Sequence, residues 1–300
     1  MKTINAFTID VEDYYHVSAF EKEISRTDWD RFESRVVRGT HRVLELLAKH
    51  NTLATFYVLG WIADRFPRLV QEIHSAGHEL GSHSYWHRLV YDLSPDEFRS
   101  DLVASLTAIE NAIGERPTNY RAPSFSITKH SLWALKILAE QGIVCDSSIF
   151  PIRHDRYGIP DAQTEIHSID TPCGPLYEFP PSVARVAGVN LPVSGGGYFR
   201  LYPLAWTVRC LRQINADGRP FMFYVHPWEL DPNQPRLSAG SQLSRLRHRV
   251  NLASTERKLD ELLSTFRFGR VCDVLEAAMP GVNGNSRARV HRESTALAGD

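Results

Sequence analysis

Short apolar runs alternate with longer segments in which apolar residues recur every three or four positions along the first half of the chain. The short runs predict buried strands, and the spacing of three and four predicts helices with one buried face. We expect strands at residues 4–10, 53–59, 78–82, 119–121 and 143–145, and helices at residues 36–50, 67–76, 95–113 and 130–141. This alternation of strands and helices favours parallel strands joined by crossover helices.

The alternation breaks after residue 149. Residues 150–192 are rich in proline, aspartate, serine and aromatic residues and predict loops with short strands, one of them at 176–179. The glycine-rich residues 194–200 predict a flexible loop, and they lack the Gly-Lys-Ser/Thr ending of a phosphate-binding loop. Helices are then expected at 204–214, 255–263 and 274–278, and strands at 220–225 and 266–271. Residues 245–249 include three arginines and a histidine, which we interpret as a solvated helix face rather than an anion site.

Composition predicts one domain over residues 1–279 and a polar, disordered tail over 280–300. A net charge of −1 argues against nucleic acid as a partner. The four cysteines are widely spaced and predict reduced core residues rather than a zinc site. Because an acid appears already at Asp10 and no apolar run approaches roughly 20 residues, we expect neither a signal peptide nor a membrane span, and a cytoplasmic protein.

His83 and His87 are four positions apart, on one face if the segment is helical there, and two imidazoles at this spacing can hold one metal ion. Three acids at the end of the first expected strand, Asp10, Glu12 and Asp13, could supply a further ligand. Alternation along a strand puts Asp10 and Glu12 on one side, and Asp13 joins them only if the strand bends or ends there.

Other polar residues also follow expected strands. Arg121 and Asp146 do so in the first half, and His226 follows the strand at 220–225. In a parallel barrel the catalytic groups lie at the carboxyl ends of the strands, so these residues are candidates for one site.

These segments resemble, in order, the motifs of the NodB-type polysaccharide deacetylases, carbohydrate esterase family 4. The matching residues are Asp10 with a nearby acid, His83-Ser84-Tyr85-Trp86-His87, Arg121-Ala122-Pro123 and Val225-His226-Pro227. The resemblance covers roughly residues 1–278, and residues 10–21 resemble more narrowly the deacetylases of exopolysaccharide gene clusters in exosortase-containing bacteria. It implies an α/β fold with a distorted parallel (β/α) barrel of about seven strands. It also implies a divalent metal, usually zinc, and hydrolysis of N-acetyl groups on a glycan.

Carried over to this chain, the resemblance implies that His83 and His87 bind the metal and that Asp10 is the catalytic base. Arg121 would pair with the base and orient it, and His226 would be the general acid. The family commonly has a second aspartate directly after the base, where this chain has Val11. The third metal ligand is therefore expected to be Glu12 or Asp13, with a slight preference for Glu12.

The turn after Arg121 also departs from the family, because Ser124 stands where many members have an aromatic residue. Its backbone N–H could still stabilise an oxyanion. Phe125, Tyr198 and Trp228 are candidates to replace the missing aromatic wall of a sugar site. A general-acid histidine must be protonated, so a carboxylate beside His226 is expected, and Asp146 is the candidate.

The main alternative is hydrolysis of a small amide, ureide or cyclic imide on the same barrel, with residues 150–192 closing a small pocket. A non-haem iron oxygenase would use two histidines and a carboxylate too, but on an antiparallel double sheet. A non-catalytic glycan-binding barrel would not need both Asp10 and His226. The expected partner is an N-acetylated glycan, nascent or lipid-linked at the inner membrane, with peripheral association to exopolysaccharide synthesis machinery.

Overall fold

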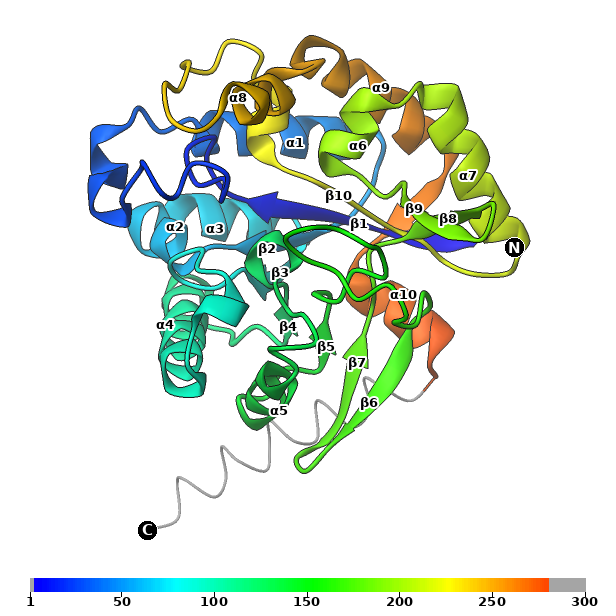
Figure 1. Cartoon of the computed structure of the whole chain (residues 1–300), viewed down its shortest axis with the longest axis horizontal. Coiled ribbons are helices and arrows are strands. Elements are labelled where there is room, and N and C mark those ends of the chain that lie inside the picture. Colours follow the sequence, from blue (N-terminus) through cyan, green and yellow to red (C-terminus); the bar gives the residue numbers. More distant parts are fainter. Residues whose placement is uncertain (1–2, 281–300) are drawn as a thin grey trace.

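The computed structural model describes residues 3–280 of the chain. A curled sheet of nine strands has the order β10-β1-β2-β3-β4-β5-β7-β6, and β11 pairs with β1 (Figure 1). Every pairing in this sheet is parallel except that of β6 with β7. The strands are β1 Ile4–Val11, β2 Thr55–Val58, β3 Glu79–Ser82, β4 Asn119–Tyr120, β5 Cys145–Asp146, β6 His167–Thr171, β7 Gly174–Glu178, β10 Met222–Val225 and β11 Arg267–Gly269.

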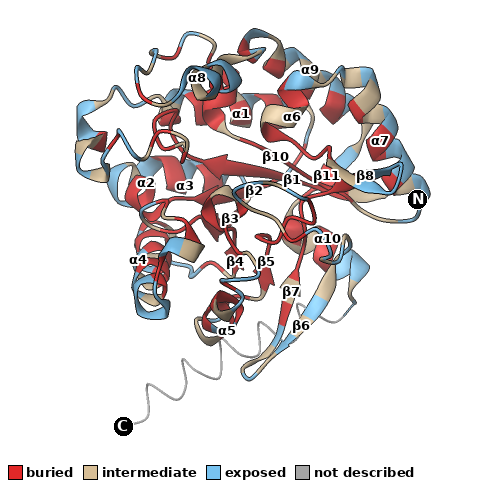
Figure 2. Cartoon of the chain, in the orientation of Figure 1, coloured by how far each residue is buried: buried red, intermediate tan, exposed pale blue. Residues whose placement is uncertain are grey.

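Helices lie around the sheet and leave β1 to β5 and β10 largely buried, whereas β6 at the edge of the sheet is partly exposed (Figure 2). They are α1 Val36–Lys49, α2 Gly60–Arg65, α3 Pro67–Ser75, α4 Pro95–Ile113, α5 Trp133–Glu140, α6 Gly196–Leu201, α7 Leu204–Ala216, α8 Gln242–Arg249, α9 Leu252–Thr265 and α10 Val271–Ala278. Short 3-10 turns are η1 Arg26–Arg31, η2 Val90–Asp92, η3 Pro123–Phe125 and η4 Pro227–Leu230. The predicted limits of α4 agree with a capping box between Ser94 and Glu97 and with left-handed Gly114 after its end.

β1 is the central strand of the site-bearing part of the sheet. It pairs with β10 on one side and, on the other, with β11 along its first residues and β2 along its last. Seven of its eight residues are buried, which explains its nearly continuous apolar sequence. Its carboxyl end is therefore surrounded by the ends of neighbouring strands, and polar residues placed there meet one another.

The second half of the chain continues the wall beyond β10, as expected for a distorted barrel. The backbone N–H of Tyr224 donates to the carbonyl of Ser194 at 2.8 Å, and that of Met222 donates to Ser182 Oγ at 2.9 Å. Gly195 has φ +137°, and a Cβ at this position would lie 1.9 Å from the carbonyl oxygen of Tyr224. Only glycine therefore allows this close approach to β10.

The prediction of a flexible loop at residues 194–200 was wrong, because α6 begins at Gly196. Tertiary contacts order this glycine-rich segment: Phe199 packs on Phe223 with ring centroids 4.9 Å apart, and Arg200 is buried against Glu229. The irregular region 150–192 contains β6 and β7 and a separate antiparallel hairpin, β8 Val183–Val186 with β9 Val189–Pro192. Residues 281–300 of the predicted tail lie outside the described residues. Among the helices described, none combines the length and apolar character required to cross a bilayer.

Candidate active site

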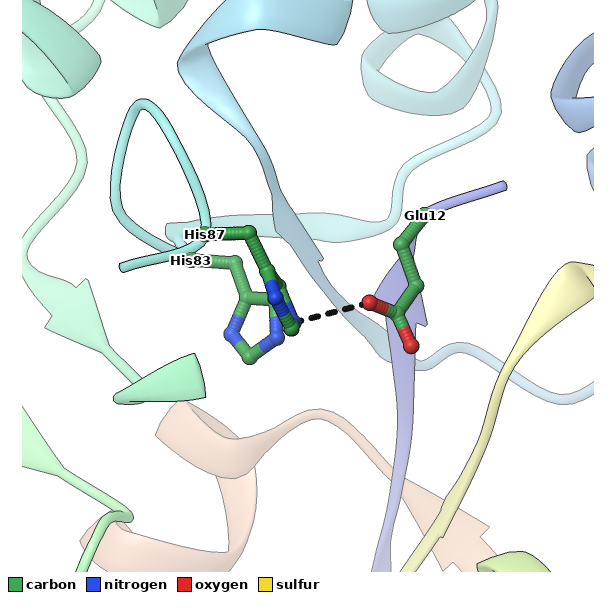
Figure 3. Close-up of side chains that lie close together, drawn as sticks. All are labelled: Glu12, His83 and His87. Carbon is green, nitrogen blue, oxygen red and sulfur yellow. Dashed lines mark ion pairs between the residues drawn. The ribbon is translucent and has the colours of Figure 1, made fainter. Parts of the chain in front are cut away.

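Glu12, His83 and His87 meet at the carboxyl ends of β1 and β3. Their ligand atoms all lie within 4.8 Å of one another, and all three residues are buried. Figure 3 shows the two imidazole rings and the carboxylate converging, with His87 Nε2 2.9 Å from Glu12 Oε2. The structure thus brings together two nitrogen donors and one oxygen donor, a set that suits a divalent metal.

A tight turn, rather than a helix, brings the two histidines together. Ser84 and His87 have φ of +65° and +52°, and the ring centroids of His83 and His87 are 5.4 Å apart. The carboxylate of Asp101 in α4 accepts hydrogen bonds from the backbone N–H groups of Tyr85 and Trp86, at 2.8 and 3.1 Å. The spacing of four residues therefore works here because α4 stabilises an unusual turn.

Neighbouring residues set the protonation states of His83 and Glu12. His83 Nδ1 lies 2.8 Å from the carbonyl oxygen of Arg121, so Nδ1 carries the proton. The lone pair of Nε2 is then free to bind a metal together with Glu12 and His87. Burial lowers the pKa of His83 to about 4, so its imidazole is neutral. Burial alone would raise the pKa of Glu12, but His87, His226 and His83 together lower it well below its usual value.

A further observation indicates that Glu12, His83 and His87 suit a cation. Glu12 Oε2 is buried and, although His87 Nε2 lies 2.9 Å away, it has no hydrogen bond of suitable geometry among the described residues. A buried anionic oxygen without a hydrogen bond is costly unless a positive charge compensates it. A neutral imidazole, an ionised carboxylate and a second imidazole are the ligands a divalent metal requires.

Asp13, the other candidate for the third ligand, lies in a different environment. Its Oδ2 accepts hydrogen bonds from Ser34 Oγ at 2.7 Å and from the backbone N–H groups of Arg35 and Val36 at 2.8 and 3.1 Å. Asp13 thus satisfies the first turn of α1, where unpaired N–H groups and the helix dipole favour an anion. The structure places Glu12 beside the histidines and Asp13 outside that group.

Asp10 and Arg121 form a buried ion pair next to this group. Arg121 Nη1 lies 2.6 Å from Asp10 Oδ1, and Arg121 is completely buried. The same Nη1 donates to Thr8 Oγ1 at 2.8 Å, and Nη2 donates to Ser147 Oγ at 3.0 Å. The guanidinium also lies over the ring of Tyr57, 4.2 Å from its centroid. These contacts fix the orientation of the Asp10 carboxylate.

His226 faces the same carboxylates from the end of β10. Its Nε2 lies 3.3 Å from Glu12 Oε1 and 3.8 Å from Asp10 Oδ2, and its Nδ1 lies 2.7 Å from Glu229 Oε1. Burial alone would lower the pKa of His226, but the charge of Glu12 and the hydrogen bond to Glu229 raise it to about 9. His226 is therefore a cation at neutral pH, the state that a general acid requires.

Glu229, and not Asp146, is the carboxylate partner of His226. The prediction of Asp146 was wrong because that residue hydrogen-bonds to Ser148 and lies opposite Glu178 in the pairing of β5 with β7. Glu229 is itself held by the buried Arg200, whose Nε lies 2.6 Å from Glu229 Oε2. The sequence signal that could have identified Glu229 is its position three residues after His226, where a 3-10 turn brings both together.

The three candidate substrate residues have different surroundings. Ser124 has φ +52°, and its hydroxyl lies 2.8 Å from that of Ser18. Tyr198 in α6 is half-buried, with its hydroxyl 3.4 Å from that of Tyr157.

Trp228 is not available to stack on a sugar, because it is only 5% exposed. Its ring lies between those of His226 and His248, with centroids 5.3 and 4.3 Å away. Its indole N–H instead donates to Glu12 Oε1 at 3.4 Å. We therefore correct its expected role from sugar contact to a residue that packs beneath the site.

Comparison with known proteins divides the chain into two matched ranges. Residues 29–143 match the family described as polysaccharide deacetylase, and residues 147–276 match a domain of unknown function, DUF3473. A peptidoglycan-N-acetylglucosamine deacetylase of Bacillus cereus is 33% identical over 96 residues, which are 32% of this chain and 35% of that protein. The deacetylase PgdA of Listeria monocytogenes is 34% identical over 108 residues, 36% of this chain and 22% of that protein. The alignments thus span about a third or less of these relatives.

Two solved structures share the fold over nearly the whole chain. One, from Mycobacterium smegmatis and assigned to the polysaccharide deacetylases, has a TM-score of 0.60 at 21% identity and covers 92% of this chain and 90% of its own. The other, the Puue allantoinase, has a TM-score of 0.59 at 14% identity and covers 93% and 92%. At these identities the likeness establishes the fold, and the different names of the two proteins show that the fold alone does not select a reaction.

Proposed function

We infer that this chain, which carries a polysaccharide deacetylase domain of the NodB type, is a metal-dependent hydrolase that removes N-acetyl groups from the amino sugars of a glycan. One observation supports this most directly. His226, held by the buried Glu229, lies 3.3 Å from the Glu12 carboxylate that meets His83 and His87, and 3.8 Å from Asp10, which pairs with the buried Arg121. A base, an acid and a metal-ligand set within one site are what hydrolysis of an amide requires.

The residues that would hold the metal are Glu12, His83 and His87. We propose zinc, because two histidines and one carboxylate with an open position form a common catalytic zinc set. Such an ion, when bound, supplies the Lewis acidity that makes water nucleophilic near neutral pH.

The chain's own residues move the protons. Asp10, oriented by Arg121 at 2.6 Å, takes the proton of the attacking water. His226, protonated and held through Nδ1 by Glu229, gives its Nε2 proton to the departing sugar nitrogen. The C–N bond breaks, and acetate and a free amine are the products. The Ser124 backbone N–H is the proposed additional donor to the oxyanion.

We further propose that the glycan is an exopolysaccharide or its lipid-linked precursor, and that the reaction takes place in the cytoplasm next to the synthesis machinery. The resemblance of residues 10–21 to deacetylases of exopolysaccharide gene clusters supports this assignment. Fractionation of cells that produce the protein tests the compartment. Active protein found in the periplasm alone would contradict it.

Acetate release from N-acetylated oligosaccharides is the direct test of the reaction. The protein is loaded with Zn²⁺ and compared with a sample kept in chelator, and with an Asp10→Asn sample carrying the same metal. We expect acetate in the first sample only. Absence of acetate at every chain length, with stoichiometric metal bound, would exclude the glycan reaction and direct the assay to small amides, ureides and cyclic imides.

A further inference from the structure

The helix α8 exposes two leucines to solvent near the candidate site. Leu243 is 54% exposed and Leu246 is 65% exposed, and a spacing of three places them on one face of the helix. Only His248 of this helix is buried, and Figure 1 shows α8 at the outer surface of the molecule. Isolated exposed leucines are common, so the charges around them decide what this face could contact.

The chain around α8 is cationic and contains no acid. Residues 232–255 include no aspartate or glutamate and carry Arg236, Arg245, Arg247 and Arg249. In the described part of the chain, no carboxylate oxygen lies within 4.0 Å of these four guanidinium groups. Arg245 donates to the carbonyls of Ser238 and Gly240 at 2.6 and 3.2 Å, so its hydrogen-bond partners are neutral groups rather than carboxylates.

Another exposed leucine provides a contrast. Leu132 is 43% exposed at the start of α5, on the opposite side of the molecule in Figure 1. The cations near it in sequence are paired: Lys129 lies 2.7 Å from Asp161, and Lys136 lies 3.7 Å from Glu140. Exposed apolar side chains and unpaired cations therefore coincide at α8 and not at α5.

We propose that Leu243, Leu246, Arg236, Arg245, Arg247 and Arg249, here the α8 surface, bind an anionic lipid bilayer. The leucines would enter the boundary between headgroups and acyl chains, and the guanidinium groups would contact lipid phosphates. Arginine suits this role because its planar donors match phosphate oxygens and it does not lose its charge. The cationic residues 245–249, read from the sequence as only a solvated helix face, would thus contact a partner.

Arg200 connects the α8 surface to the candidate acid. Its Nη1 donates to the carbonyls of Arg247, His248 and Val250 at 3.2, 2.8 and 2.9 Å. Its Nε binds Glu229, which in turn holds His226. A bilayer on the α8 surface would therefore have a fixed position relative to the site, as a substrate tethered to lipid requires. This last point rests on the proposed function, whereas binding to lipid does not.

Vesicle co-sedimentation of the full chain without glycan tests the proposal. Vesicles of phosphatidylcholine with phosphatidylglycerol are compared with vesicles of phosphatidylcholine alone. We expect binding to the anionic vesicles, weakened by high salt and reduced about tenfold or more in the double variant Leu243→Ser and Leu246→Ser. Arg247→Gln should reduce it about fivefold. Leu132→Ser is the matched control and should bind like the unchanged protein.

The proposal is overturned if the unchanged protein stays in solution with anionic vesicles, or if Leu132→Ser reduces binding as much as the double variant. It is also overturned if the protein is a dimer that the double variant dissociates, since the α8 surface would then contact a second copy. Circular dichroism checks that each variant is folded. Acetate release from a soluble oligosaccharide, measured separately, should be unchanged in the double variant, so failure of lipid binding and failure of the proposed reaction are distinguishable.

Discussion

His83 and His226 come from different halves of the chain and approach the same Glu12 carboxylate, yet their protonation states are opposite. Burial lowers the pKa of His83 to about 4, and its Nδ1 donates to a neutral carbonyl. For His226 the carboxylates of Glu12 and Glu229 outweigh burial and raise its pKa to about 9. Burial thus dominates at His83 and two carboxylates dominate at His226, which separates a metal-ligand histidine from an acid histidine.

The two halves also differ in how their site residues are held. In the first half, Asp10 lies near the end of β1, and Glu12, His83 and Arg121 directly follow β1, β3 and β4, so the sheet positions them. In the second half, His226 depends on Glu229, and Glu229 depends on Arg200, which belongs to α6, 29 residues away in sequence. The metal side of the site (Asp10, Glu12, His83 and Arg121) is therefore built from strand ends. The acid side (His226, Glu229 and Arg200) is built from side-chain contacts between distant segments.

The largest expected effects distinguish the metal ligand His83 from the catalytic base Asp10. His83→Ala should abolish both metal binding and activity because it removes a ligand. Asp10→Asn should keep the metal and lower kcat by about a hundredfold to ten-thousandfold, the range for loss of a general base. Metal content by atomic spectroscopy and acetate release measure the two properties. Near-normal turnover in Asp10→Asn would refute the assignment of the base.

A second pair of variants compares the adjacent acids. Glu12→Gln should lose metal affinity, whereas Asp13→Asn should keep it and instead lower the free energy of unfolding by about 1 kcal/mol, because Asp13 caps α1. Metal titration and urea unfolding give the two results. Loss of metal in Asp13→Asn with Glu12→Gln unaffected would reverse the assignment.

On the acid side, Glu229→Gln should retain the metal and lower kcat by about tenfold to a hundredfold. Without the negative charge of Glu229, His226 should lose its proton at a lower pH, so the alkaline fall of kcat should move to lower pH. Asp146→Asn is the control and should leave the position of this fall unchanged. A shift in the control alone would restore Asp146 as the partner.

A last prediction tests burial as the cause of a neutral histidine, away from the site. Burial lowers the pKa of His78 from its ordinary 6.5 to about 4. The unfolded chain then binds more protons, so His78 makes stability fall as pH drops from 6.5 toward 4, by at most about 1.4 kcal/mol per pH unit. His78→Asn keeps an acceptor for the N–H of Ala54 and should flatten this dependence in urea unfolding. The exposed His130→Asn should not, and equal slopes for both variants would contradict the explanation.

Much of the fold and of the metal side could be predicted from the sequence because the signals are local. The apolar run of β1, the capping box of α4 and the four-residue spacing of His83 and His87 each involve neighbours along the chain. Parallel strands then place their carboxyl ends at one edge, so Asp10, His83 and Arg121 were expected to meet. The resemblance of the ordered motifs to those of the deacetylases predicted that His226 belongs to the same site.

Tertiary structure alone decided the remaining assignments. Asp13 turns to α1 because Ser34, Arg35 and Val36 offer hydrogen donors there, which leaves Glu12 beside the histidines. Trp228 is enclosed by His226 and His248, and α6 is ordered by Phe223 and Glu229, contacts that no local pattern contains. A sequence pattern reports periodicity over a few residues, whereas burial and charge pairing depend on which distant segments the fold brings together. The partner of His226 is only three residues away, but the 3-10 turn that brings Glu229 to it is not part of the strand pattern that located His226.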